Sequence, residues 1–120
     1  MAKFLPVEWI FHWLLEAPLF EFEWDKGNST KSLDKHNVHP QETEEVFLGR
    51  AAVPLGIQIE PPVNEERLCI IGPTWSERLL SIVFTIREGR VRPISSRPAN
   101  QKEKKIYEKV RKVSQRVRRH

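Results

Sequence analysis

The spacing of apolar residues predicts an antiparallel meander in the second half of the chain. RLCIIG (67–72), RLLSIVFTIR (78–87) and VRPISSR (91–97) are short runs of apolar and β-branched residues separated by turn-forming segments, which is typical of strands. AAVPLGIQI (51–59) predicts a weaker strand before them, because Pro54 and Gly56 interrupt it. The sheet is therefore expected to have three firm strands and one weak one in this half.

The first half predicts one strand followed by two helices. LFEFEW (19–24) alternates apolar and acidic residues, as a half-buried strand does. Asp25 is placed to cap a helix from about Lys26 to His36, and Asn37 is a natural stop because asparagine tolerates the left-handed conformation. Pro40 then opens a second, acidic helix, QETEEVF, which ends at Gly49.

Helices are also predicted at both ends of the chain. FLPVEWIFHWLLEAPLF (4–20) is interrupted by prolines and charges and is too short to span a bilayer. Read as a helix over 7–17 it is amphipathic, with one polar stripe of Glu8, His12 and Glu16, so it must pack on its own domain or on a partner. The C-terminal segment carries a narrow apolar stripe, Ile106, Val110, Val113 and Val117, within a strongly basic helix. These elements together predict an α+β domain with helices against an antiparallel sheet of about four to five strands.

The predicted hairpin FTIREGRVRPISSR (84–97) concentrates arginines on one face. A two-residue turn at Glu88-Gly89 would set Arg87 opposite Arg90, Thr85 opposite Arg92, Val83 opposite Ile94 and Ser81 opposite Ser96. Leu80, Ile82, Phe84, Ile86 and Val91 then form the core face. On the other face, like charges oppose each other, which is unfavourable. Either a phosphate binds between the guanidinium groups, or the arginines extend into water.

Charge and composition narrow the function further. Residues 1–66 carry five Lys/Arg against twelve Asp/Glu, or −7, whereas residues 67–120 carry fifteen against four, or +11. This asymmetry favours a nucleic-acid partner for the C-terminal half, unless the folded surface interleaves the two halves. The single cysteine, Cys69, excludes an internal disulfide and is expected to be a core side chain in a reducing cytoplasm. We expect no metal site and no cofactor, since no ligand spacing or nucleotide-binding motif is present.

An ordered set of short motifs resembles the BrnT family of type II toxin–antitoxin toxins. The motifs are FEWD (22–25), KH (35–36), EEVF (44–47), ER (66–67), IGPT (71–74), RLLSIVFTIR (78–87), VRPISSR (91–97) and EKKIYE (103–108). The resemblance divides the chain into a helical appendage (1–20), a toxin domain (21–108) and a basic helical extension (109–120). It implies a RelE-like fold in a small cytoplasmic ribonuclease that a BrnA-like antitoxin neutralises. Operator DNA would be bound only through the antitoxin complex, and no membrane is involved.

The resemblance also implies site residues. The family's positions fall on Lys35, His36, Arg67, Arg78, Thr85, Arg87, on Ile94, Ser95, Ser96 and Arg97, and on Glu103 and Tyr107. Three positions depart from the family: Leu48-Gly49 replaces Asp-Pro, Glu77 replaces a glycine, and Pro93 replaces an isoleucine. Pro93 removes a ladder hydrogen bond, so it makes its strand an edge strand or a bulged one.

Metal-free RNA cleavage needs a base, an acid and cations at the phosphate. His36 or Lys35 would exchange protons, Arg78, Arg87 and Arg97 would hold the phosphate, and Thr85 or Ser96 would orient it. Further phosphate contacts are expected from Arg67, Arg90, Arg92, Lys104 and Lys105. His36 could instead end its helix structurally, and Arg67 and Arg97 could pair with carboxylates of the acidic half. The alternative function is a catalytically inactive RelE-like module that binds nucleic acid or an antitoxin-like protein.

Overall fold

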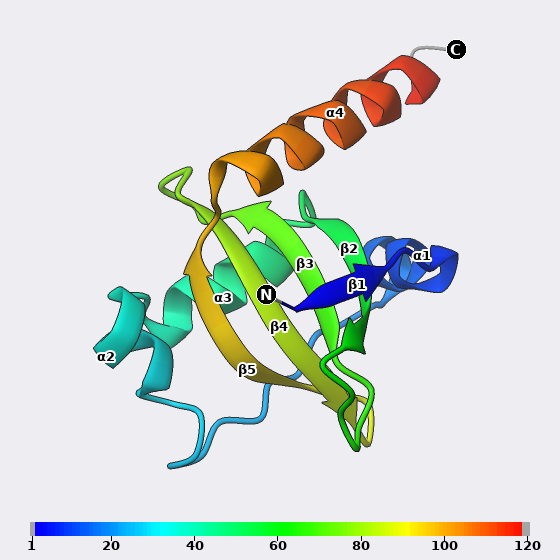
Figure 1. Ribbon diagram of the computed structural model, residues 1–120. Coiled ribbons are helices and arrows are strands. Elements are labelled where there is room, and N and C mark those ends of the chain that lie inside the picture. The colour runs from blue at the N-terminus through cyan, green and yellow to red at the C-terminus, as the bar shows by residue number, and fades with distance from the viewer. Residues whose placement is uncertain (1, 119–120) are drawn as a thin grey trace.

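A single antiparallel meander forms the frame of the protein in the computed structural model, which describes residues 2–118 (Figure 1). Its strands hydrogen-bond in chain order: β1 (Lys3–Leu5), β2 (Val53–Glu60), β3 (Leu68–Pro73), β4 (Leu79–Arg87) and β5 (Arg90–Pro98). The helices are α1 (Glu8–Glu16), α2 (Lys31–His36), α3 (Pro40–Leu48) and α4 (Gln101–Arg118). The α+β class predicted from the sequence is confirmed, and the four strands of residues 53–98 match the expected meander.

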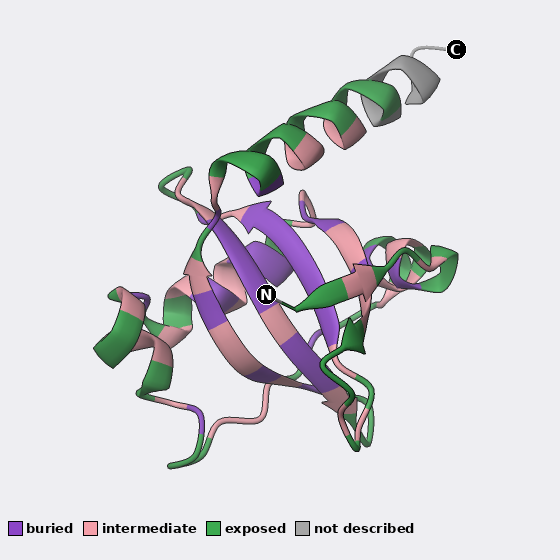
Figure 2. Cartoon of the chain, in the orientation of Figure 1, coloured by how far each residue is buried: buried purple, intermediate pink, exposed green. Residues whose placement is uncertain are grey.

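One face of the sheet carries the main core. Leu68, Ile70, Leu80, Ile82 and Phe84 alternate along β3 and β4, and all five are at most 1% exposed. Side chains of α1 and α3 pack against this face, which we call the helix-covered face. Figure 2 shows the buried residues concentrated on β3 and β4.

Aromatic side chains hold the centre of that core together. The Phe47 ring of α3 meets the Phe84 ring at a centroid distance of 5.0 Å, and Trp13 of α1 stacks on Phe84 at 5.8 Å. Helix α1 is therefore built into the core of its own domain, which decides between the two roles the sequence left open for it.

No helix within residues 2–118 has the length and apolarity needed to cross a membrane.

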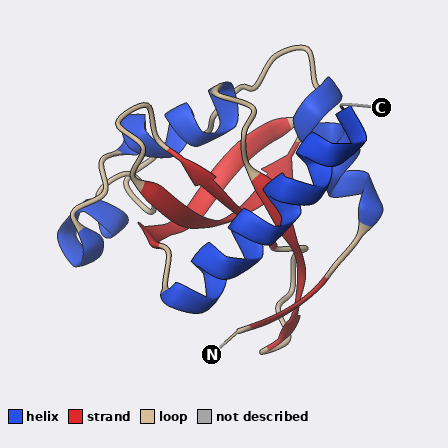
Figure 3. Cartoon of the chain, turned by 90° about the horizontal axis from the view of Figure 1, so that it is seen from above, coloured by secondary structure: helices blue, strands red, loops and turns tan. Residues whose placement is uncertain are grey.

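Among the described residues, a helix covers the opposite face of the sheet only at one end, and we call it the open face. Tyr107 and Val110 of α4 pack there on Val53, Ile71 and Ala99, and the rest of α4 projects away from the sheet (Figure 1). Figure 3 shows the molecule from above, with the long helix lying over the strands in that view. Of the stripe predicted on α4, Val110 packs in this cluster, Val113 is 55% exposed, and the side chain of Val117 lies outside the described residues.

The predicted strand over residues 19–24 is wrong. Only a parallel bridge forms there: Glu23 N–H donates to the Val91 carbonyl, and Val91 N–H donates to the Glu21 carbonyl, each at 2.8 Å. Pairing stops because Pro93, the next outward-facing residue of β5, has no N–H to donate. The side-chain amide of Asn28 instead donates to the Pro93 carbonyl at 2.9 Å.

The other boundaries differ in smaller ways. Residues 26–30 form turns rather than the start of a helix, which fits the weak helix preference of Gly27 and Asn28. Asn37 does end α2 in the left-handed region, with φ 54°, and Pro40 does open α3. Strand β1 was not predicted; it pairs antiparallel with the edge of β2.

A β-bulge changes the expected register of the β4–β5 hairpin. Arg87 opposes Arg90 and Thr85 opposes Arg92, as predicted, and Phe84 then opposes Pro93. Beyond this point the register shifts, so that Val83 opposes Ser95 rather than Ile94, and Ser81 opposes Arg97 rather than Ser96. One extra residue, Ile94, is inserted next to Pro93, where the ladder has already lost a donor. The shift turns Ser96 to the helix-covered face and Arg97 to the open face.

Arg97 in its new position fixes α4 to the sheet. Its guanidinium donates two hydrogen bonds to the Glu103 carboxylate, at 2.7 and 2.8 Å. Glu103 and Asn100 also form a reciprocal cap at the start of α4, with both main-chain N–H groups bonded at 2.9 Å. Ser81 Oγ donates to the same carboxylate at 3.0 Å. Although burial acts to raise the pKa of Glu103, the hydrogen bonds from Arg97 and Asn100 outweigh it and hold this pKa below its ordinary value.

Truncation on the two sides of α1 should test whether this helix is part of the core. Ile10 is fully buried whereas Leu15 is 38% exposed, so Ile10→Ala should lower the free energy of unfolding by about 2–5 kcal/mol and Leu15→Ala by about 1 kcal/mol or less. Urea denaturation of the two variants measures both losses. Equal, small losses would mean that α1 is not anchored in the core.

The Glu103 contacts should make stability depend on acid. Because its folded pKa is lowered, the contribution of Glu103 is complete above its ordinary pKa of 4.5 and is lost as the pH falls through the folded value. Glu103→Gln should therefore cost about 1–3 kcal/mol at pH 7, and the gap to the wild type should narrow below pH 4.5. Denaturant titrations at pH 7 and pH 3 test this, with Glu108→Gln, exposed on the same helix, as the control. A gap that stays constant with pH would contradict it.

Candidate nucleic-acid interface

The residues predicted to act in catalysis or to bind the phosphate do not gather at one point of the structure. Arg67, Thr85, Arg87 and Arg97 belong to the open face or its rim, whereas Lys35, His36 and Arg78 lie on the side of α2 and α3. Arg78 and Arg87 stand nine residues apart along β4, which corresponds to roughly 30 Å. A single phosphate cannot bridge that span.

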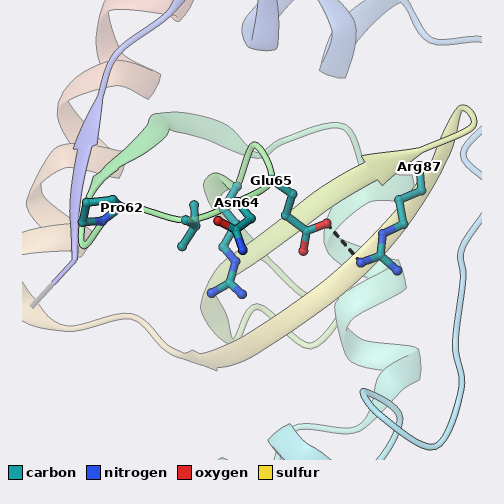
Figure 4. A pocket seen from close by; sticks show the side chains of 6 residues that line it. Pro62, Asn64, Glu65 and Arg87 are labelled. Atoms are coloured by element: carbon teal, nitrogen blue, oxygen red, sulfur yellow. Dashed lines mark hydrogen bonds and ion pairs between the residues drawn. The ribbon is translucent and has the colours of Figure 1, made fainter.

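A pocket of about 540 Å³ lies at the β4–β5 turn end of the open face (Figure 4). It is lined by Pro62, Val63, Asn64, Glu65, Arg67 and Arg87. Arg87 pairs with Glu65 at 3.0 Å, as the dashed line in Figure 4 marks. The Nε of Arg67 is buried and has no hydrogen-bond partner among the described residues. An unpaired buried N–H carries a desolvation cost, and the guanidinium of Arg67 belongs to a residue that lines the pocket.

Thr85 supports this pocket from below. Its side chain is 3% exposed, and its Oγ1 donates to the Glu66 main-chain carbonyl at 2.8 Å. Thr85 thus holds the segment that carries Glu65 and Arg67 against β4. Its hydroxyl is committed to this bond, so its position favours a role in shaping the pocket.

A second, larger groove of about 680 Å³ lies at the α4 end of the same face. Arg97, Asn100, Lys102, Glu103 and Ile106 form one wall, Cys69, Ser81 and Val83 form the floor, and Ala2, Lys3, Phe4, Leu55 and Ile59 form the other wall. The Arg97 side chain is 36% exposed, and the Glu103 hydrogen bonds raise its pKa above the ordinary value. Burial raises the pKa of Cys69 to about 11, so this thiol is an unreactive core group, as the sequence predicted.

Carboxylates neutralise the arginines of the hairpin edge. Arg92 donates to Asp25 at 2.8 Å and lies 3.5 Å from Glu23, and Arg90 lies 3.5 Å from Glu21. The hydrogen bond from Arg92 lowers the pKa of Asp25. The hairpin sequence left phosphate or water as the two ways to relieve the repulsion between the arginines, and the structure shows a third, pairing with carboxylates of the same chain. Their signal was in the sequence, because Glu21, Glu23 and Asp25 recur every two residues, as the arginines do.

Arg78 fastens the end of α2. Its guanidinium donates to the main-chain carbonyls of Asn37 at 2.9 Å and His36 at 3.2 Å, and it pairs with Glu42 at 3.2 Å. These three contacts give Arg78 a structural role in the fold. Lys35 and His36 themselves lie one helical turn beyond Ser32, whose Oγ accepts the Ser96 main-chain N–H at 2.8 Å. The Lys35–His36 pair is thus held near the outer edge of β5, close to the stretch that ends in Arg97.

Ser96 is an interior residue. Its side chain is 1% exposed, and its Oγ lies 2.7 Å from Thr43 Oγ1 of α3. The bulge places Ser95, opposite Val83, on the open face instead. Sequence reasoning chose Ser96 because it assumed an uninterrupted ladder, and Pro93 was the signal for the interruption.

Lys104 and Lys105 are exposed on α4, free to meet a polyanion that lies along this end of the sheet.

Comparison with known proteins places this geometry in a family. No curated protein matches the sequence at a significant level. The family model described as "Ribonuclease toxin, BrnT, of type II toxin-antitoxin system" matches residues 24–103, which is 80 of the 120 residues. The match contains the whole β2–β5 meander, both pockets' arginines and Glu103, but not β1 or α1. The chain therefore belongs to the BrnT family of ribonuclease toxins of type II toxin–antitoxin systems.

Proposed function

We propose that this toxin cleaves RNA without a metal, with the RNA strand lying along the open face between the two pockets. Family membership makes RNA the substrate and an antitoxin protein the partner. The mechanism rests on the residues of this chain. In it, the 2′-hydroxyl attacks the adjacent phosphorus, the P–O5′ bond breaks, and the products carry a 2′,3′-cyclic phosphate and a 5′-hydroxyl.

The observation that carries the proposal is that Arg67, whose buried Nε has no hydrogen-bond partner among the described residues, lines the 540 Å³ pocket together with Arg87. A guanidinium group matches phosphate oxygens in geometry as well as charge. A phosphate in this pocket would satisfy Arg67 and would give Arg87 a second anion beside Glu65. Arg67 and Arg87 therefore form the first phosphate contact in our proposal.

Arg97 contacts a different phosphate. It stands opposite Ser81, six residues from Arg87 along β4, or roughly 20 Å. Arg67 and Arg87 would hold the strand at the turn end of the sheet, and Arg97 would hold it at the α4 end, with Lys104 and Lys105 beyond. Arg90 and Arg92 are engaged by Glu21, Glu23 and Asp25 and would contribute only long-range attraction.

We assign the reacting phosphate to the Arg97 end because α2, which carries the proton-transfer candidates Lys35 and His36, is bonded to β5 at Ser96, next to Arg97. Arg97 would stabilise the charge on the pentacoordinate phosphorane. His36 or Lys35, at the outer edge of β5, would take the 2′-hydroxyl proton and return a proton to the leaving 5′-oxygen. Ser95 lies on the open face, as Arg97 does, and would orient the phosphate in place of Ser96.

Removal of Arg67 should test the phosphate path. Arg67→Gln should lower kcat/KM for cleavage of a defined RNA about 10- to 100-fold, because a charge-assisted phosphate contact is lost. The wild type should cleave in the presence of excess EDTA, and its products should end in a 2′,3′-cyclic phosphate. Cleavage abolished by EDTA would contradict the metal-independent mechanism.

The matched control for this experiment is Lys26→Gln, which removes one positive charge from an exposed turn outside both pockets. It should cleave as the wild type does, at the same ionic strength. Equal losses for Arg67→Gln and Lys26→Gln would mean that only the total charge matters. A folded wild type that binds RNA without cutting it would support the inactive binding module instead.

The two serines beside the bulge should separate stability from activity. Ser96→Ala leaves the buried Thr43 hydroxyl without its partner and should cost about 1–3 kcal/mol of folding free energy, with cleavage by the folded protein retained. Ser95→Ala should leave the melting temperature nearly unchanged and reduce the cleavage rate. Thermal melts and initial rates measure both effects. The reverse assignment would show that Ser96 reaches the substrate.

A further inference from the structure

We infer that the groove between β1 and α4 is a nucleobase subsite, in which Phe4 stacks on one base of the bound RNA. The inference rests on the proposed function, since it names a base-binding site on the same RNA path. It is carried by three features of the groove: an apolar lining, positive charges at its rim, and continuity with the phosphate path.

The lining of this groove suits the flat, apolar face of a base. Five of its side chains are Phe4, Leu55, Ile59, Val83 and Ile106, drawn from β1, β2, β4 and α4. Its volume of about 680 Å³ falls in the range of small-molecule sites in proteins. Phe4 is the only aromatic residue among those lining it, and base–aromatic stacking is the common way in which proteins hold unpaired bases.

The charges around the groove select an anionic occupant. Lys3, Arg97 and Lys102 lie in its walls. Glu103 is buried and bonded to Arg97, Ser81 and Asn100, so its charge is already compensated. Lys3 pairs with Glu60 at 3.3 Å, but both side chains are more than half exposed, and such pairs are weak and easily exchanged. A base with its phosphate fits this combination of apolar and cationic groups.

The groove continues the path of the phosphate pocket. Cys69 in its floor stands two residues from Arg67, or roughly 7 Å along the strand. The N-terminal end of β1 lies in front of β3 and β4 in Figure 1, consistent with Ala2, Lys3 and Phe4 sharing the groove with Val83. A strand of RNA that passes Arg67 and Arg97 would therefore run beside Phe4. Since β1 lies outside the family match, this subsite would be a feature of this chain's own N-terminal segment.

Binding of a short RNA that carries a 2′-O-methyl group at every position, and so cannot be cleaved, tests the inference. Phe4→Leu keeps an apolar side chain but removes the ring, and Phe4→Tyr keeps the ring. We expect Phe4→Leu to weaken binding about fivefold or more and Phe4→Tyr to bind as the wild type does. Circular dichroism and thermal melts of each variant establish that it is folded.

Abasic substitutions in the same RNA locate the base. If Phe4 stacks on one base, the loss caused by Phe4→Leu should disappear when that one nucleotide is made abasic and persist when any other is. A loss that is the same for every abasic position would overturn the inference.

Arg67→Gln, measured in parallel, separates this inference from the proposed function. If Arg67→Gln weakens RNA binding and Phe4→Leu does not, the base subsite is wrong and the phosphate path stands. If the wild type does not bind the RNA, both are wrong. If Phe4→Leu weakens only the binding of the antitoxin, the groove is a protein-docking site, and the base subsite is likewise overturned.

Discussion

The insertion of Ile94 into the β4–β5 ladder determines which side chains of β5 reach each face of the sheet. Because side chains alternate along a strand, one extra residue exchanges the faces of everything beyond it. Arg97 reaches the open face only for this reason, and there it binds Glu103 and docks α4. The same exchange buries Ser96 against Thr43. The groove, the placement of α4 and the proposed reacting end of the site all depend on that one insertion.

Ion pairs organise the basic surface, and their strengths differ with burial. Arg90 and Glu21 are both more than half exposed, so their pair stabilises weakly. The Arg92 side chain is 15% exposed and donates two hydrogen bonds to Asp25, so it is held more firmly. The Arg97–Glu103 pair is different, because Glu103 is 7% exposed and is also bonded to Ser81 and Asn100. RNA cannot displace Glu103 without undocking α4. In the proposed RNA complex, Arg97 would therefore contact a phosphate while it stays bonded to Glu103.

The sequence predicted the elements of this fold better than the way in which they meet. Periodicity located α1, α3 and the four strands of the meander, and Asn37 and Pro40 were read correctly as boundaries. The strand predicted over 19–24 was wrong. The alternation of apolar and acidic residues fits any half-buried edge segment, and it cannot show that Pro93 limits the pairing. Strand β1 has only three residues, too few for a period to be visible. The prediction of the site was affected most. A one-residue register shift moves each side chain beyond it to the other face of the sheet, while the pattern of apolar and polar residues in the sequence stays the same.

Residues 2–16 link the stability of this domain to the shape of its site. Ile10 and Trp13 of α1 complete the core on the helix-covered face, and β1, directly before them, crosses to the open face and forms a wall of the groove. Only Pro6 and Val7 separate β1 from α1, and β1 also pairs with the edge of β2, so the packing of α1 and this pairing together hold β1 in position. Loss of core packing in α1 would loosen one of the two attachments of β1, so the stability of the domain and the proposed RNA contact are coupled in this segment. Substitutions confined to the groove side of β1 are the ones that separate the two contributions.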